Sequence, residues 1–74
     1  MSVEAISRVT IDPAIRSGQP IIRGTRTTVA DILGLLASGA PQTEILNDFP
    51  WLTPEDIAAA LEYAAEEMRR KIAR

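Results

Sequence analysis

The sequence contains no cysteine and no histidine among its 74 residues, and only 4% of its residues are aromatic. Without these side chains the chain has no disulfide, no thiolate nucleophile, no imidazole base and no Cys or His ligand for zinc. We therefore predict that the protein is not an enzyme, with no catalytic residue, no metal site and no bound cofactor.

Long apolar runs are also missing. No stretch approaches the roughly 18 residues that indicate a membrane-spanning helix, and no basic segment leads into an apolar stretch as in a signal peptide. The fractions of hydrophobic and charged residues, 46% and 24%, are typical of a globular chain. These features predict a cytoplasmic protein without membrane contact.

The small size of the chain predicts a partner. A domain of this length buries only about 60% of the surface that its unfolded chain exposes. Small scaffolds compensate with disulfides, a structural metal or association with another chain, and the composition argues against the first two. We therefore expect a homodimer or a higher homo-oligomer.

The charges divide into three blocks. Residues 1–26 carry a net charge of +2, residues 27–68 carry −8 and residues 69–74 carry +4. The arginines of the first block are candidate contacts to nucleic acid or a partner protein, with a solvated strand face as the alternative. These four candidates are Arg8, Arg16, Arg23 and Arg26.

The first 28 residues are expected to form a β arm. Residues 7–12 alternate polar and apolar side chains, residues 18–20 are typical of a turn, and residues 21–23 favour a second short strand. Two short strands are marginal alone, so we predict that this arm is the dimerisation segment. Its candidate dimer contacts, with one residue from the last helix, are Val9, Ile11, Ile21, Ile22 and Tyr63.

Residues 29–74 are expected to form three helices of about 10, 7 and 19 residues. Thr28 with Asp31 is suited to cap the first helix, and Gly39 to end it. The second runs from about Pro41 to Asp48, and Thr53 caps the third. The result is a trihelical bundle of helix-turn-helix proportions, and the fold class is mainly α with a short N-terminal β segment.

The sequence of the third helix predicts one apolar face for packing and one charged face. Its apolar residues recur at helical spacing. They are Ile57, Ala60, Leu61, Ala64, Met68 and Ile72. Glu66 with Arg70, and Glu67 with Lys71, are expected to pair at i,i+4. The expected solvent-facing residues near its start are Glu55, Asp56, Ala59, Glu62 and Tyr63, and their carboxylates argue against a DNA-reading role for this helix.

A longer pattern joins these elements. Ile11-Asp12-Pro13 is followed by Gly18-Gln19-Pro20-Ile21-Ile22-Arg23-Gly24-Thr25-Arg26 and later by Phe49-Pro50-Trp51-Leu52-Thr53-Pro54-Glu55-Asp56-Ile57. Over residues 7–65 the chain resembles the domain of unknown function 433 family, which is grouped with VapB-type antitoxins. The resemblance implies a homeodomain-like trihelical fold and an antitoxin that neutralises a PIN-like ribonuclease toxin encoded beside it.

Three functions stay open at this point. The first is the antitoxin, which would also regulate its own promoter if the arginine-bearing arms bind DNA. The second is a DNA-binding transcriptional regulator without a toxin. The third is a small oligomerisation module.

Overall fold

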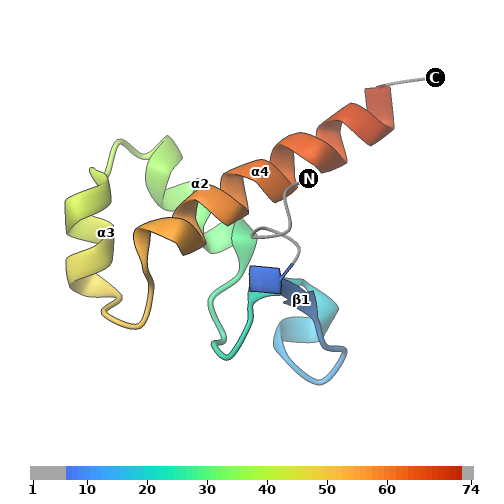
Figure 1. The fold of residues 1–74 in the computed structure, drawn as a ribbon, viewed down its shortest axis with the longest axis horizontal. Helices are drawn as coiled ribbons and strands as arrows, with labels where there is room; N and C mark the ends of the chain where they lie inside the picture. Colours follow the sequence, from blue (N-terminus) through green and yellow to red (C-terminus); the bar gives the residue numbers. More distant parts are fainter. Residues whose placement is uncertain (1–6, 73–74) are drawn as a thin grey trace.

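The structure is a computed structural model, which describes residues 7–72 of the chain. Within this range two short strands precede three helices (Figure 1), which confirms the predicted mainly α class. The strands are β1 (Val9–Ile11) and β2 (Pro20–Ile22), and the helices are α2 (Val29–Ala37), α3 (Gln42–Asp48) and α4 (Pro54–Ile72). The helices contain 9, 7 and 19 residues, close to the lengths that the sequence predicted.

The two strands form an antiparallel sheet in which Val9 faces Ile22 and Ile11 faces Pro20. Val9 is buried, but Ile11, which the alternating pattern placed on the same face of the strand, is 56% exposed. After β2 the chain reverses at Gly24, whose φ of +82° favours a residue without a side chain.

The loop between the strands contains an unusual left-handed turn, η1 (Arg16–Gly18). Its three residues have φ values of 49°, 59° and 79°. Arg16 and Ser17 have side chains, and the left-handed region costs such a residue about 1 kcal/mol. The sequence predicted a turn at residues 18–20, but the turn lies earlier because Pro20 already belongs to β2.

The helix ends follow the sequence signals. Thr28 and Asp31 form a reciprocal capping box at the start of α2, each side chain accepting the backbone N–H of the other. Thr53 and Asp56 make the same exchange at the start of α4. Gly39, with a φ of +93°, follows the end of α2. These local interactions satisfy backbone groups that the helices leave unpaired.

Strands and helices share one hydrophobic core. Its buried members are Val9, Ile22, Val29, Ile32, Ile45, Leu52, Ile57, Ala59 and Ala60. Because the sheet supplies Val9 and Ile22, the described part of the predicted arm packs into the same core as the helices. β1 contacts α4, and β2 contacts α2.

The apolar stripe predicted along α4 is only partly buried. Ile57 and Ala60 lie in the core, whereas Leu61 and Met68 are 47% and 57% exposed. Leu61 adjoins the buried Ala60 but faces away from the core, whereas Met68 belongs to the C-terminal turns of α4, which extend past the other helices (Figure 1). The core therefore covers only part of the predicted apolar stripe. The side chain of Ile72 lies outside the described part.

Two residues that were expected to face solvent near the start of α4 are buried. Asp56 is 6% exposed and Ala59 is 2% exposed. The helical pattern did not reveal this, because β1 contacts α4 and Arg8 binds Asp56 across 48 residues of sequence.

The charge pairs near the end of α4 are shifted by one residue from the prediction. Glu66 pairs with Arg69, and Glu67 pairs with Arg70, each at 3.0 Å and at i,i+3 spacing. Both spacings bring side chains to the same side of a helix, so the sequence alone does not choose between them. None of the helices within residues 7–72 has the length and apolar character needed to cross a bilayer.

Candidate functional site

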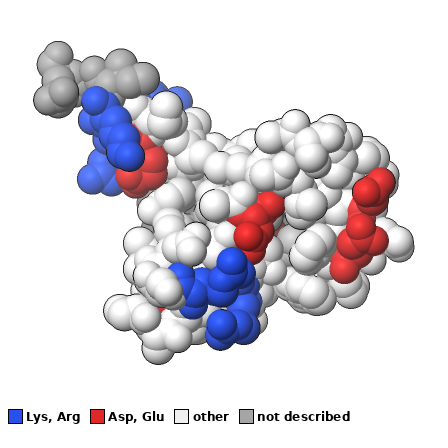
Figure 2. Space-filling view, turned by 180° about the vertical axis from the view of Figure 1, so that it is seen from behind, with Lys and Arg blue, Asp and Glu red and all other residues white. Residues whose placement is uncertain are grey.

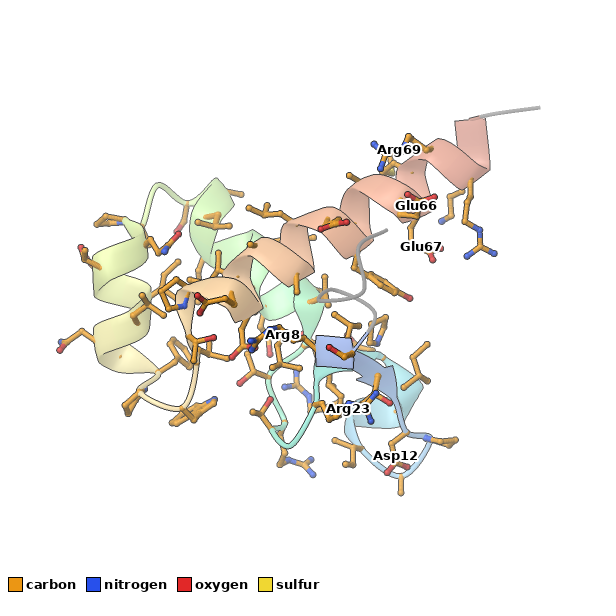
Figure 3. All side chains as sticks on the ribbon, in the orientation of Figure 1. Arg8, Asp12, Arg23, Glu66, Glu67 and Arg69 are labelled. Atoms are coloured by element: carbon orange, nitrogen blue, oxygen red, sulfur yellow. The ribbon has the colours of Figure 1, made fainter. Side chains whose placement is uncertain are left out.

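Arginines of the N-terminal block bind other residues of the same chain. Arg8 donates to the Asp56 carboxylate at 3.0 Å, across 48 residues of sequence. Its side chain is 31% exposed and that of Asp56 is 8% exposed. Because Asp56 also accepts the Thr53 N–H, Arg8 fixes β1 to the capped end of α4. Figure 3 shows Arg8 near the start of that helix.

Arg16 repeats this arrangement at the other capped helix. Its guanidinium donates to Asp31 at 3.0 Å and to the Arg26 carbonyl at 3.0 Å. Burial acts against ionisation of Asp31, but hydrogen bonds from the Thr28 N–H and Arg16 outweigh it and lower its pKa below the usual 3.8. Two of the four candidate arginines therefore act as internal ties.

The other two arginines are exposed. Arg23 donates through Nε to the Ser7 carbonyl at 2.8 Å, while Arg26 lies in the loop before Thr27. Figure 2 shows basic atoms gathered over the N-terminal segment and again at the end of α4, in each case beside acidic atoms. The basic surface available to a partner on this segment is thus smaller than the four arginines suggest.

Three of the five predicted dimer contacts are buried inside the protein. Val9, Ile21 and Ile22 are 8%, 1% and 2% exposed, so their side chains are not on the surface. Ile11 is exposed, and Tyr63 is half-buried against the core. Only Ile11 and Tyr63 of the proposed set are accessible to a second chain.

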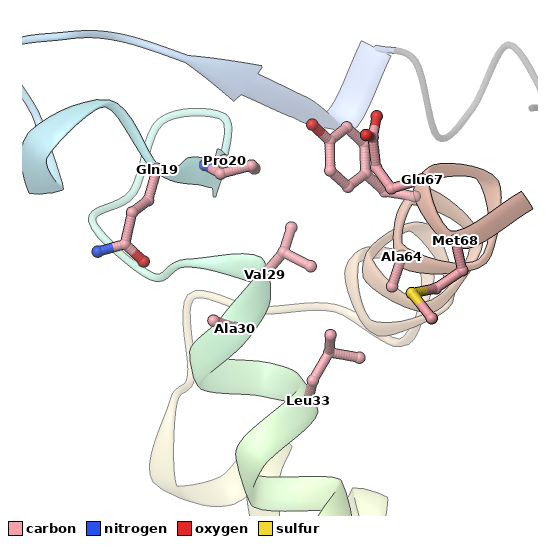
Figure 4. A pocket seen from close by; sticks show the side chains of 9 residues that line it. Gln19, Pro20, Val29, Ala30, Leu33, Ala64, Glu67 and Met68 are labelled. Carbon is pink, nitrogen blue, oxygen red and sulfur yellow. The ribbon is translucent and has the colours of Figure 1, made fainter. Parts of the chain in front are cut away.

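A groove runs between the β segment, α2 and α4 (Figure 4). It has a volume of about 310 Å³ and is open to solvent on one side. Its lining is mostly apolar. The residues are Gln19, Pro20, Val29, Ala30, Leu33, Tyr63, Ala64, Glu67 and Met68.

The groove offers a concave apolar surface with few polar groups. Glu67 lies at one side of it and Gln19 lies across from Glu67 (Figure 4), and Tyr63 belongs to the same lining. Burial, followed by the negative charge of Glu67, raises the pKa of Tyr63 above 10.0, so its phenol stays protonated at neutral pH. No group of three or more acidic residues suited to a metal ion occurs within residues 7–72. The arrangement is suited to bind an apolar group.

Sequence reasoning did not find this groove. Val29 and Leu33 lie in the first predicted helix, and Ala64 and Met68 belong to the predicted apolar stripe of the last helix. A signal was present in the small residues Ala30 and Ala64, which leave space between their helices. Their joint position depends on how α2 packs against α4, which no local pattern gives.

A family model described as "Protein of unknown function (DUF433)" matches residues 9–64. A solved structure, the crystal structure of a DUF433 member protein from Anabaena variabilis, is similar with a TM-score of 0.75 and 31% sequence identity. The similarity covers 100% of this chain and 87% of that one. The fold is therefore shared with a solved structure over its whole length.

Two curated relatives are similar over most of this chain. The "Uncharacterized protein y4eO" of Sinorhizobium fredii is 39% identical over 56 residues, which cover 76% of this chain and 25% of that protein. The protein named "Putative antitoxin VapB45" of Mycobacterium tuberculosis is 36% identical over 59 residues, which cover 80% and 24%. The chain thus spans about a quarter of the length of the curated relatives it matches.

Proposed function

The chain belongs to the family of unknown function DUF433, and from this premise we propose that it is an antitoxin-like protein that binds and neutralises a PIN-like ribonuclease toxin. The observation that carries the proposal is the 36% identity, over 59 residues, to the mycobacterial protein named "Putative antitoxin VapB45". The resemblance of residues 7–65 to the domain of unknown function 433 family, which is grouped with VapB-type antitoxins, implies the PIN-like class of toxin. We assign the chain no catalytic role, and we place its action in the cytoplasm.

The groove between α2 and α4 is the surface that we assign to the toxin. Its apolar lining fits an aliphatic or aromatic side chain of a partner protein. Glu67 at its side favours a partner segment in which a basic residue stands beside the apolar one. The excess of acidic residues in the 27–68 block complements a basic ribonuclease in the same way.

Co-expression tests the proposal directly. The tagged chain is produced together with each of the two proteins encoded by its neighbouring reading frames. We expect one of them to co-purify with it and to degrade RNA only after the chain has been removed. The proposal is overturned if neither neighbour is a PIN-like protein, or if its ribonuclease activity is the same with and without the chain.

A pair of matched variants tests the groove. Ala30 and Ala37 are both exposed alanines of α2, but only Ala30 lines the groove. We expect Ala30→Glu to weaken toxin binding at least tenfold, because it introduces a charge into an apolar contact. Ala37→Glu should bind as the unmodified chain does. Equal affinities for the two variants would remove the groove from the proposal.

Promoter binding is a separate part of the proposal, and it rests on the arm rather than on α4. Glu55 is exposed at the start of α4, where it would repel phosphates. Arg23 and Arg26 are exposed on the N-terminal segment. We expect duplex binding to weaken steeply with salt and to be lost in the Arg23→Ala/Arg26→Ala variant. Unchanged binding by this variant would exclude the arm as the DNA contact.

A further inference from the structure

The outer face of α4 carries a second apolar stripe, on the side away from the core. Ala58, Leu61, Ala65 and Met68 are all exposed, and they follow one another at intervals of three, four and three residues. This is the heptad spacing of helices that pack against another helix. In the sequence the same spacing continues to Ile72. A helix that needed only to cover the core would carry polar residues here.

The charges of α4 are ordered along its length. Five acidic residues lie between Glu55 and Glu67, and all basic residues lie after Met68. Two parallel copies of α4 would bring the basic segments together, which is unfavourable. Two antiparallel copies would instead place the acidic half of each helix beside the basic end of the other.

We propose that α4 pairs with α4 of a second copy in an antiparallel, two-fold symmetric homodimer along this outer stripe. In this register Ala65 faces the partner subunit's Met68, so that a small residue meets a large one. The symmetry produces the same contact a second time. The pairing does not depend on a toxin and therefore stands apart from the proposed function.

The flanks of the stripe fit the same register. Glu62 follows Leu61, and Arg69 follows Met68, so both lie on the same side of the stripe. Glu62 would then lie beside the partner subunit's Arg69. Arg69 already pairs with Glu66 at 3.0 Å, but an exposed i,i+3 pair is weak and is exchanged easily. Charge and packing therefore select one orientation and one register.

The oligomeric state is the first test. Sedimentation of the full chain at micromolar concentration should give a dimer. Ala65→Glu, which introduces a charge at the centre of the stripe, should give a monomer with an unchanged circular dichroism spectrum. The matched control is Ala37→Glu, an exposed alanine of α2 outside the stripe, which should stay dimeric. A monomeric unmodified chain, or a dimeric Ala65→Glu variant, would overturn the proposal.

A charge exchange tests the flanking pair. Glu62→Arg alone and Arg69→Glu alone should each be monomeric, because each homodimer would contain like charges at both flanks. A mixture of the two variants should form a heterodimer, in which every flanking pair is again opposite in charge. Variants that dimerise alone, or a mixture that stays monomeric, would contradict the proposed register. Recovery in the mixture also shows that both variants are folded.

Introduced cysteines test the orientation, since the natural chain contains none. In the antiparallel register the two Ala58 positions are about 25 Å apart, from a rise of about 1.5 Å per residue. Ala58→Cys should therefore not cross-link, because a disulfide requires Cα atoms within about 7 Å. A mixture of Ala65→Cys and Met68→Cys chains should cross-link readily. Cross-linking of Ala58→Cys would instead indicate parallel helices.

Binding of another protein at the stripe is the remaining outcome. If the unmodified chain is monomeric and Ala65→Glu abolishes its binding to the co-purified toxin, the stripe belongs to the toxin interface. That result would reject the second copy as its occupant and would leave the proposed function intact. Conversely, a dimer without any toxin partner would support the stripe and reject the function.

Discussion

Replacing Asp56 with alanine would remove three interactions at the start of α4 together. Its carboxylate accepts the Thr53 N–H at 3.0 Å and the Arg8 guanidinium at 3.0 Å. It also lies in the first turn, where the helix dipole favours a negative charge. Because Asp56 is buried and Arg8 is partly buried, water replaces these contacts poorly. We expect this side chain to be important for stability.

The size of the effect follows from the separate contributions. The cap contributes about 1 kcal/mol, and the interaction with the dipole about 0.3–1 kcal/mol. Loss of a partly exposed ion-pair partner adds about 1 kcal/mol at most. Asp56→Ala should therefore lower the free energy of unfolding by about 1.5–3 kcal/mol, which corresponds to a fall in Tm of roughly 6–24 °C for a domain of this size. Asp56→Asn, which keeps an acceptor oxygen for the cap, should lose about half as much.

Urea unfolding measures these differences, with the single tryptophan as the fluorescent reporter. Trp51 donates its indole N–H to the Thr27 hydroxyl at 2.9 Å and packs edge-on against Phe49 at 5.5 Å between ring centroids. Both contacts disappear on unfolding, so the emission should change at the same urea concentration as the helical signal.

A double-mutant cycle isolates the ion pair. Arg8→Met retains the apolar stem of the side chain and removes its charge. The cycle with Asp56→Ala should give a coupling free energy of about 0.5–1 kcal/mol. A coupling of zero, or an Asp56→Ala variant within about 0.5 kcal/mol of the unmodified chain, would refute the reasoning that Arg8 ties β1 to α4.

Three further predictions concern the backbone and pH. Ser17→Gly should raise the free energy of unfolding by about 0.5–1 kcal/mol in urea, because glycine accepts the left-handed φ of 59° without strain. The pKa of Asp31 is lower in the folded chain, so its contribution to stability should be lost as pH falls from 3.8 through the folded pKa, and Asp31→Asn should flatten this acid dependence of the urea midpoint. The pKa of Tyr63 is higher in the folded chain, so stability should fall as pH rises past 10.0 and through that pKa; Tyr63→Phe should lack this alkaline loss.

The helices were predictable because their signals are local. The capping pair Thr28 and Asp31 lies within one turn, and Gly39 ends α2 with a conformation that glycine adopts most readily. Such contacts involve residues three or four positions apart, which the sequence places together without any knowledge of the fold. The short strands were found for the same reason, since two-residue alternation is local.

The functional roles of the charged residues were less predictable. Arg8 meets Asp56 across 48 residues, so neither the ion pair nor the burial of Asp56 appears in any local pattern. The groove likewise combines the β segment, α2 and α4. The stripe of α4, in contrast, has a local signal that is ambiguous. The spacing of Leu61 and Met68 fits a face toward the core and a face away from it equally well. Which apolar residues the core covers depends on the side on which α2 and β1 pack against α4 and on how far α4 extends past its neighbours.

Met68 connects the two proposed surfaces of this protein, since it is part of the outer stripe and also lines the groove. A second copy that places its Ala65 position on Met68 would fix one side of the groove. If the second copy orders the Met68 side chain, a toxin that binds in the groove loses less conformational entropy when it orders the same side chain. Because such coupling is reciprocal, a toxin that binds the dimer more tightly than the monomer must also strengthen the dimer by the same factor. Ala30→Glu alters only the groove and Ala65→Glu only the stripe, whereas Met68→Ala alters both. Comparing toxin binding and dimerisation in the three variants therefore separates the direct contacts from this coupling.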